Sequence, residues 1–149
     1  MARRQSKKPL AAITVNLFDV DKMSRGGRKY PLDILAKTVD DINSNSTVIE
    51  EISPIERELK HIPVTDVWME HAMAKSTRAY FEDGQVKVDF DVVPNKYGEL
   101  LMKTIETEGG IDKMNFMPVG YGNTADDGTV SDYKFCYVTF KVGGNNGNA

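Results

Sequence analysis

Apolar and polar residues alternate along several stretches of this chain, and alternation at a period of two predicts β-strands. In residues 85–93 the charged side chains share one face and the apolar ones share the other, namely Val86, Val88, Phe90 and Val92. Similar patterns predict further extended segments over residues 10–20, 66–75, 76–81 and 130–142. Residues 47–59 carry scattered apolar positions and Pro54, which indicates a strand or short helical turns.

Two other stretches repeat apolar residues at helical spacing. Residues 29–43 include Pro31, which suits the first turn of a helix, and one apolar stripe made of Leu32, Leu35, Val39 and Ile42. Residues 96–108 form a second predicted helix, ended by Gly109 and Gly110, with an apolar side made of Leu100, Leu101 and Ile105. Asp83 and Gly84 predict a hairpin turn. This order of elements predicts an α+β fold, a mainly antiparallel β-sheet or barrel with two packed helices.

Residues 114–130 predict a glycine-rich corner between two strands. An apolar run ends in Gly120 and Gly122, and a turn over residues 124–128 leads into the last strand. Many hydrolases place a nucleophilic Ser or Cys at such a corner. Here the corner residues are Met117, Pro118 and Val119, and none of them carries a nucleophilic group.

The composition is that of one soluble globular domain, with 149 residues and a net charge of -3. The acidic balance disfavours nucleic acid as the main partner. Cys136 is the single cysteine, so no internal disulfide forms, and its place on an alternating strand favours a small buried side chain over a reactive thiol. No apolar run approaches the ~20 residues of a membrane span, and no secretory signal follows the basic N-terminus. We therefore expect a protein used or assembled inside a reducing cell.

The two ends differ from the body of the chain. Residues 1–9 predict a flexible basic arm that carries Arg3, Arg4, Lys7 and Lys8. Residues 10–142 form the single predicted domain, and residues 143–149 form a flexible Gly/Asn tail. The arm either keeps the protein soluble or contacts an acidic partner surface or nucleic-acid phosphates.

Groups able to perform catalysis are few. His61 and His71 lack the close spacing with other ligands that a metal site needs, so we expect no metal and no cofactor. No phosphate-binding, dinucleotide-binding or G-x-S-x-G motif occurs. Four carboxylates favour a solvated face: Glu50, Glu51, Glu56 and Glu58. His61 is either a surface or half-buried histidine, or a general base whose partner comes from elsewhere in the fold.

Four short segments, taken in order, carry a resemblance. They are S-R-G-G-R-K-Y-P-L-D-I-L (24–35), R-E-L-K-H-I-P (57–63), D-G…Y-G-E-L-L…I (83–105) and G-Y-G…G-T-V-S-D-Y-K-F (120–135). Together they resemble the prohead maturation protease of tailed phages, a serine protease family related to the herpesvirus assemblin fold. The second segment is similar to the family motif G-E-L-x-H-P, which equates His61 with the catalytic histidine. The last is similar to the end of V-S-S-R-G-x-G…G-x-V-x-D-Y-x-L, which equates Met117 and Pro118 with the paired serines and Val119 with the arginine.

The resemblance implies a prohead-protease-like fold without catalysis, because a serine protease that lacks its serine cannot form the covalent intermediate. It implies a non-enzymatic virion structural protein, either an auxiliary or decoration subunit of the capsid or a component of the head core. The implied partners are the major capsid protein and other head proteins, with self-association also open, and no membrane. The implied location is the virion, assembled in the host cytoplasm.

Aromatic side chains are natural anchors for such contacts if they are exposed. Together with the basic arm, the predicted binding residues are Trp68, Tyr80 and Tyr121, whereas Phe81 is expected to pack in the core.

Two other functions stay open. An active prohead serine protease would need a displaced nucleophile near His61, supplied by Ser76, Ser131 or Thr124. A small phage nucleic-acid-binding protein would use the basic arm with an aromatic-bearing sheet, and the net negative charge disfavours it.

Overall fold

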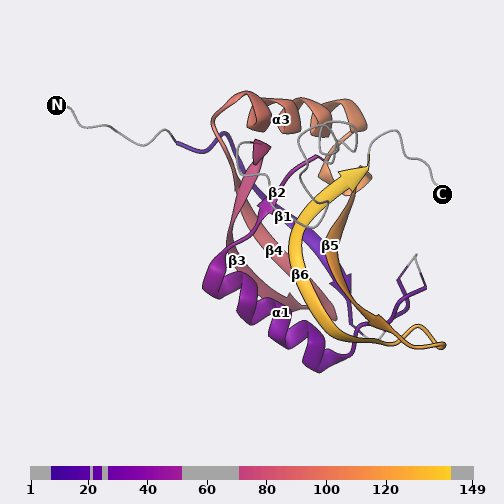
Figure 1. Cartoon of the computed structure of the whole chain (residues 1–149). Helices are drawn as coiled ribbons and strands as arrows, with labels where there is room; N and C mark the ends of the chain where they lie inside the picture. The colour runs from indigo at the N-terminus through magenta and orange to yellow at the C-terminus, as the bar shows by residue number, and fades with distance from the viewer. Residues whose placement is uncertain (1–7, 21, 25–26, 52–70, 142–149) are drawn as a thin grey trace, which may run out of the picture.

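The chain folds into a curled six-stranded β-sheet against which helices α1 and α3 pack (Figure 1). This computed structural model describes residues 8–20, 22–24, 27–51 and 71–141. Its main elements are β1 (Ala12–Asp19), α1 (Leu32–Asn45), β2 (Val48–Ile49), β3 (Ala74–Glu82), β4 (Gln85–Val92), α3 (Lys96–Glu108), β5 (Asn115–Thr124) and β6 (Val130–Lys141). The predicted α+β class is confirmed.

The strands lie in the order β1-β4-β3-β2-β6-β5. Neighbouring strands are antiparallel except β2 and β6, which pair in parallel at Ile49 and Val138. Because β2 has only two residues, it is a short link between two antiparallel ladders, β1-β4-β3 and β6-β5. The sheet curls until its two edge strands, β1 and β5, approach each other, which gives a half-barrel (Figure 1).

The inner face of β4 forms the centre of the core. Its four apolar side chains, Val86, Val88, Phe90 and Val92, are all 0% exposed, as the alternation predicts. They pack with Val15 and Leu17 of β1 and with apolar residues of α1 and β6. Between them, the polar residues of β4 point to the outer face.

Helix α1 covers the gap that the short β2 leaves between β3 and β6, and it packs against both of these strands (Figure 1). Leu35, Val39 and Ile42 form the buried stripe. The prediction is wrong for Leu32, which is 56% exposed, because the part of the helix that meets the sheet begins one turn later. Thr38 takes a buried place on this side, where its hydroxyl donates to the Ile34 carbonyl at 2.9 Å.

Helix α3 has the predicted bounds. The side chain of Asn95 caps it by accepting from the N–H groups of Tyr97 and Gly98, both at 2.9 Å, and Gly109 ends it in the left-handed conformation with φ of 96°. Leu101 is fully buried, but Leu100 is 44% exposed and does not belong to the buried side. The helix therefore buries a narrower stripe than its sequence suggests.

The hairpin turn between β3 and β4 forms as predicted. Asp83 and Gly84 both have positive φ, 54° and 75°, which matches the twist of two-residue hairpins. Strand β3 begins at Ala74, and Met73 before it still pairs with Ile49 and Val93 through backbone bonds of 2.8 Å. The extended structure predicted for 66–75 is wrong at His71, which belongs to a 3₁₀ turn, and residues 66–70 lie outside the described part.

Candidate functional site

Strand β5 carries the predicted corner. The structure shows a continuous ten-residue strand instead, which runs through Gly120 and Gly122 and turns only at residues 125–128. Two irregularities in its pairing with β6, between Val119 and Gly120 and between Tyr121 and Asn123, bend the strand without ending it. The glycine pair therefore does not present a side chain at a tip.

Both glycines of β5 make room for Tyr133 of β6. A Cβ atom at Gly120 would overlap the Tyr133 hydroxyl and lie 2.6 Å from the Lys134 carbonyl oxygen. A Cβ atom at Gly122 would lie 3.0 Å from the Tyr133 Cα and 2.9 Å from the Ser131 carbonyl oxygen. Packing of the Tyr133 side chain at Gly120 and close approach of the β6 backbone at Gly122, rather than exposure of a nucleophile, are thus the physical reasons for these glycines.

Met117 and Pro118 occupy opposite faces of β5. Pro118 lies opposite Val138 of β6, a residue of the main core, so its ring faces the inside of the half-barrel. Met117 lies opposite Thr139 on the other face. Because β5 is an edge strand, it tolerates a proline that cannot donate a hydrogen bond. Neither a thioether nor a pyrrolidine ring can attack a carbonyl carbon.

The face that carries Met117 is buried along β6. Tyr137 and Thr139 are 0% and 5% exposed, and Val119 lies opposite Tyr137. Tyr137 also packs with Val48 and Ala72 in a second apolar cluster, against which the half-buried Cys136 lies. This face of β5 and β6 is consequently an apolar surface, in which Thr139 supplies a hydroxyl.

Glu50 contradicts the predicted solvated face of carboxylates. It directly follows β2, its N–H donates to the Val138 carbonyl at 3.0 Å, and it is fully buried. The backbone of Glu50 thus continues the pairing of β2 with β6. The acidic sequence around Glu50 gives no sign that this residue is buried. Glu51 is exposed as predicted, and Glu56 and Glu58 lie outside the described residues.

Thr139 is the basis of a stability prediction. Its buried Oγ1 has no hydrogen-bond partner in the described structure. A buried hydroxyl without a partner is unfavourable, so Thr139→Val should raise the free energy of unfolding by about 1 kcal/mol. Urea unfolding followed by circular dichroism measures this difference.

Thr38→Val is the matched control for Thr139→Val, because the buried hydroxyl of Thr38 does donate a hydrogen bond, to Ile34. This control should leave the stability unchanged or reduce it. A destabilised Thr139→Val protein would show that the Thr139 hydroxyl does have a partner in solution.

Of the predicted histidine and its alternative nucleophiles, the structure describes only the three hydroxyl residues. His61 lies outside the described residues. The ring of His71 stacks on Tyr97 of α3, with centroids 4.5 Å apart. Ser76 of β3 accepts the Thr47 N–H at 2.8 Å, and Ser131 is an exposed residue at the beginning of β6. Thr124 ends β5 next to the turn, so Thr124 and Ser131 lie together at the turn end of the β5–β6 hairpin, whereas Ser76 lies on β3.

The predicted binding residues fall into three groups. Arg3, Arg4, Lys7 and Trp68 lie outside the described residues, and Lys8 is exposed. Tyr121 is 57% exposed, as an anchor requires. Phe81 is 42% exposed, so its predicted core position is wrong, because it lies where β3 approaches its exposed hairpin turn.

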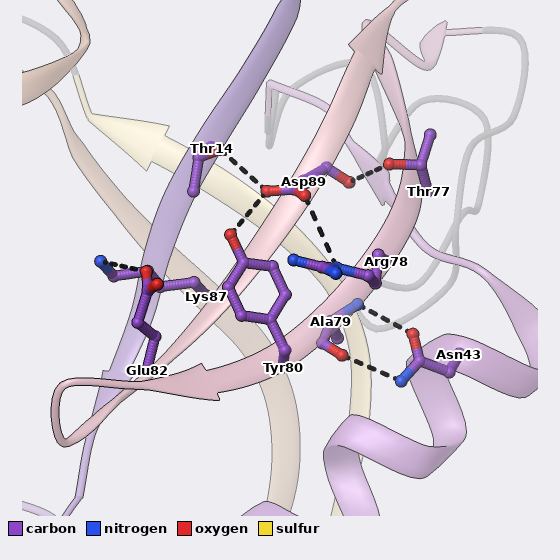
Figure 2. Close-up of polar contacts among 9 residues, drawn as sticks. All are labelled: Thr14, Asn43, Thr77, Arg78, Ala79, Tyr80, Glu82, Lys87 and Asp89. Atoms are coloured by element: carbon purple, nitrogen blue, oxygen red, sulfur yellow. Dashed lines mark hydrogen bonds and ion pairs between the residues drawn. The ribbon is translucent and has the colours of Figure 1, made fainter.

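Tyr80 is held within a polar cluster on the outer face of β1, β4 and β3. Figure 2 shows Asp89 at its centre, accepting hydrogen bonds from Thr14 at 2.8 Å and from the Tyr80 hydroxyl at 2.9 Å. Arg78 lies 3.8 Å from Asp89 and 4.0 Å from the centre of the Tyr80 ring. These contacts join three strands, so Tyr80 has a structural role even where it is half exposed.

Three aromatic residues that the sequence pattern does not connect meet beside the glycines of β5. Tyr30 contacts Phe18 and Tyr133 edge to face, with ring centroids 4.9 Å and 5.2 Å away. Backbone bonds from Lys29 to Gly128 and from Val130 to Lys29, at 2.8 Å and 2.9 Å, hold the β1–α1 connection against β6. The sequence offers one signal of this aromatic cluster: Gly120 and Gly122 lie on one strand, and Tyr133 lies on the next strand along the chain.

Within residues 8–20, 22–24, 27–51 and 71–141, no cluster of His, Cys, Asp and Glu is arranged to hold a metal ion. In the same part of the protein, no helix combines the length and the apolar character of a membrane span.

Comparison with known proteins relates this geometry to a solved structure. No protein-family model matches the chain, and no curated protein matches its sequence. The fold is similar to that of the capsid assembly protease of bacteriophage T4, gp21, with a TM-score of 0.66 and 18% sequence identity, over 96% of this chain and 92% of that chain. The predicted prohead-protease-like fold is therefore confirmed: this chain has the fold of a phage capsid assembly protease.

Proposed function

We propose that this chain is a non-enzymatic structural protein of a phage head, built on a capsid-assembly-protease fold and retained for binding head proteins. One observation carries the proposal. Within a fold similar to that of the T4 protease, the two positions that the sequence resemblance equates with paired serines hold Met117 and Pro118.

The surroundings of these positions support the loss of catalysis. The half-buried Pro118 ring lies on the core side of β5 through its pairing with Val138, and it carries no nucleophilic group. Met117 lies on a face whose neighbours, Val119 and Tyr137, are an aliphatic residue and a buried tyrosine. Covalent catalysis needs an activated hydroxyl or thiol at this place, and these residues supply none.

The proposed partners are the major capsid protein and other head proteins, and the proposed location is the virion. A protease that processes head proteins must recognise their surfaces, and a fold that loses the nucleophile keeps those surfaces. The exposed ring of Tyr121 is an anchor of the kind that protein interfaces favour. The basic residues of the N-terminal arm, Arg3, Arg4, Lys7 and Lys8, suit an acidic shell.

Quantitative mass spectrometry of purified heads tests the proposal. The expected result is full-length protein in mature heads, at one copy per major capsid subunit or at a simple fraction of that number. Absence of the protein from mature heads would contradict a structural role.

An active protease is the second candidate, because the Thr139 hydroxyl, which has no hydrogen-bond partner among the described residues, lies directly opposite Met117. Its test is processing of capsid precursors in cells that carry His61→Ala, Thr139→Val or Ser131→Ala. Unchanged processing in all three supports the structural role, whereas loss of processing in His61→Ala would establish catalysis and overturn the proposal.

A further inference from the structure

A small pocket opens beside the glycines of β5, between the β5–β6 hairpin and the connection from β1 to α1. Its volume is about 200 Å³, and it is lined by Arg28, Tyr30, Gly120, Tyr121, Gly122, Thr124, Val130 and Tyr133. Sites for drug-sized ligands usually measure about 300–1,000 Å³, so this pocket fits one side chain or a group of similar size.

The walls of the pocket are built by features already described. The segment around Lys29 runs parallel to the start of β6, and residues 28 and 30 flank Lys29 on the same side of this extended segment. This places Arg28 and Tyr30 together beside Tyr133. Across from them, Gly120 and Gly122 leave the strand without side chains.

The polar groups of the pocket are mainly hydrogen-bond donors. Tyr30 is only 8% exposed, yet its hydroxyl makes no hydrogen bond to another described residue. The Tyr133 hydroxyl also makes no hydrogen bond to another described residue. Unlike the buried Thr139 hydroxyl, both tyrosine hydroxyl oxygens are accessible to solvent. Arg28 forms no ion pair within the described residues, and its side chain is exposed.

Burial raises the pKa of the Tyr133 hydroxyl above its usual value, and the neighbouring Tyr30 raises it further, although Arg28 opposes both. The phenol thus stays neutral at physiological pH and keeps its proton to donate. The nearby carboxylates are satisfied on the hairpin itself: Asp127 accepts the Thr129 N–H at 2.9 Å, and Asp132 accepts from Asn123 at 3.1 Å. They do not line the pocket.

We propose that this pocket binds a carboxylate group of a partner protein, supplied by an Asp or Glu side chain or by the C-terminus of a polypeptide. The Arg28 guanidinium compensates the charge, and the hydroxyls of Tyr30 and Tyr133 donate to the carboxylate oxygens. One cation and two neutral hydrogen-bond donors are suitable partners for an anion, and a charge-assisted hydrogen bond such as that from Arg28 is stronger than a neutral one. Binding of a carboxylate also gives the buried Tyr30 hydroxyl the acceptor that it lacks.

This inference does not depend on whether the protein is an enzyme or a structural subunit, because the groups that bind the carboxylate are Arg28, Tyr30 and Tyr133, and none of them is at a position equated with the catalytic residues. It is tested on the isolated full-length protein, without head proteins. Failure of the pocket and failure of the proposed function are therefore separate results.

The experiment is a titration followed by the ¹⁵N–¹H signals of the Gly120 and Gly122 amides. The probes are N-acetylglutamate α-methylamide, whose carboxylate is on the side chain, N-acetylalanine, whose carboxylate is terminal, and the neutral glutamine counterpart of the first. We expect saturable shifts with a Kd on the order of millimolar for one or both carboxylates and none for the neutral probe. The stronger of the two carboxylate probes identifies the source.

Substitutions assign the binding to the pocket. Arg28→Gln should weaken binding about tenfold, and Tyr30→Phe and Tyr133→Phe about fivefold each. Lys134→Gln is the matched control, because it removes one positive charge next to Tyr133 from the opposite face of β6 and should change Kd less than about twofold. Equal binding of the neutral probe, unchanged binding by Arg28→Gln, or no shift up to the solubility limit of the carboxylates would each overturn the proposal.

Discussion

Replacing Gly98 with Ala should lower the free energy of unfolding by about 3 kcal/mol, the upper part of the range for an overpacked core. Gly98 is buried in the first turn of α3, and a Cβ atom there would overlap the Val93 carbonyl oxygen and lie 2.8 Å from its carbon. That carbonyl is fixed by a hydrogen bond from the Asn95 N–H at 2.9 Å. Helix α3 would therefore have to move away from the backbone at Val93.

The sign of this effect is the test, because Gly→Ala within a helix normally raises stability by about 0.5–1 kcal/mol. Thr107→Ala, at an exposed position of the same helix, is the control and should raise stability slightly. Urea unfolding of both variants gives the comparison. A Gly98→Ala protein as stable as the parent would mean that α3 is not held against Val93 in solution.

Asn43→Ala should lower the free energy of unfolding by about 2 kcal/mol, because two hydrogen bonds are lost. The Asn43 amide donates to the Ala79 carbonyl at 2.9 Å, and its oxygen accepts the Ala79 N–H at 2.8 Å (Figure 2). Strand β2 pairs with β3 only at Lys75 and Ala74, so further along β3 the side chain from α1 replaces the missing strand. Without it, the backbone of the buried Ala79 lacks these two partners.

Asn45→Ala is the control for Asn43→Ala, since Asn45 is an exposed residue of the same type near the end of the same helix. It should change stability by less than about 0.5 kcal/mol. Asn43→Asp keeps an acceptor for the N–H but sets a carboxylate against the Ala79 carbonyl, so it should not restore stability at neutral pH. Equal stability of Asn43→Ala and Asn45→Ala would contradict the bridging role.

Much of the fold is predictable from local pattern. The strand over residues 85–92, the helix over 96–108 and the turn at Asp83 and Gly84 follow from alternation, helical spacing and glycine chemistry, which act within a few residues. The errors occur where burial depends on distant contacts. Leu32 and Leu100 lie on apolar helix sides but do not reach the sheet, and Glu50 is buried because β6 pairs beside it.

The candidate site was less predictable for the same reason. The glycines of β5 read as a corner because nothing in their own sequence shows that Tyr133 needs the space. Arg28, Tyr30 and Tyr133 come together through backbone bonds between residues roughly one hundred positions apart in sequence, at Lys29 and Val130. The absence of a hydroxyl at Met117 and Pro118 could be read directly, since it depends only on residue identity.

The two edges of the curled sheet limit how this protein aggregates. An open edge is a template on which another molecule can add a strand, and natural proteins protect such edges with proline, bulges and glycine-induced bends. Strand β5 has Pro118 and two pairing irregularities, and β1 has an irregularity between Asn16 and Phe18. Pro118, which cannot donate a hydrogen bond to an added strand, thus makes β5 a poor seed for cross-β growth.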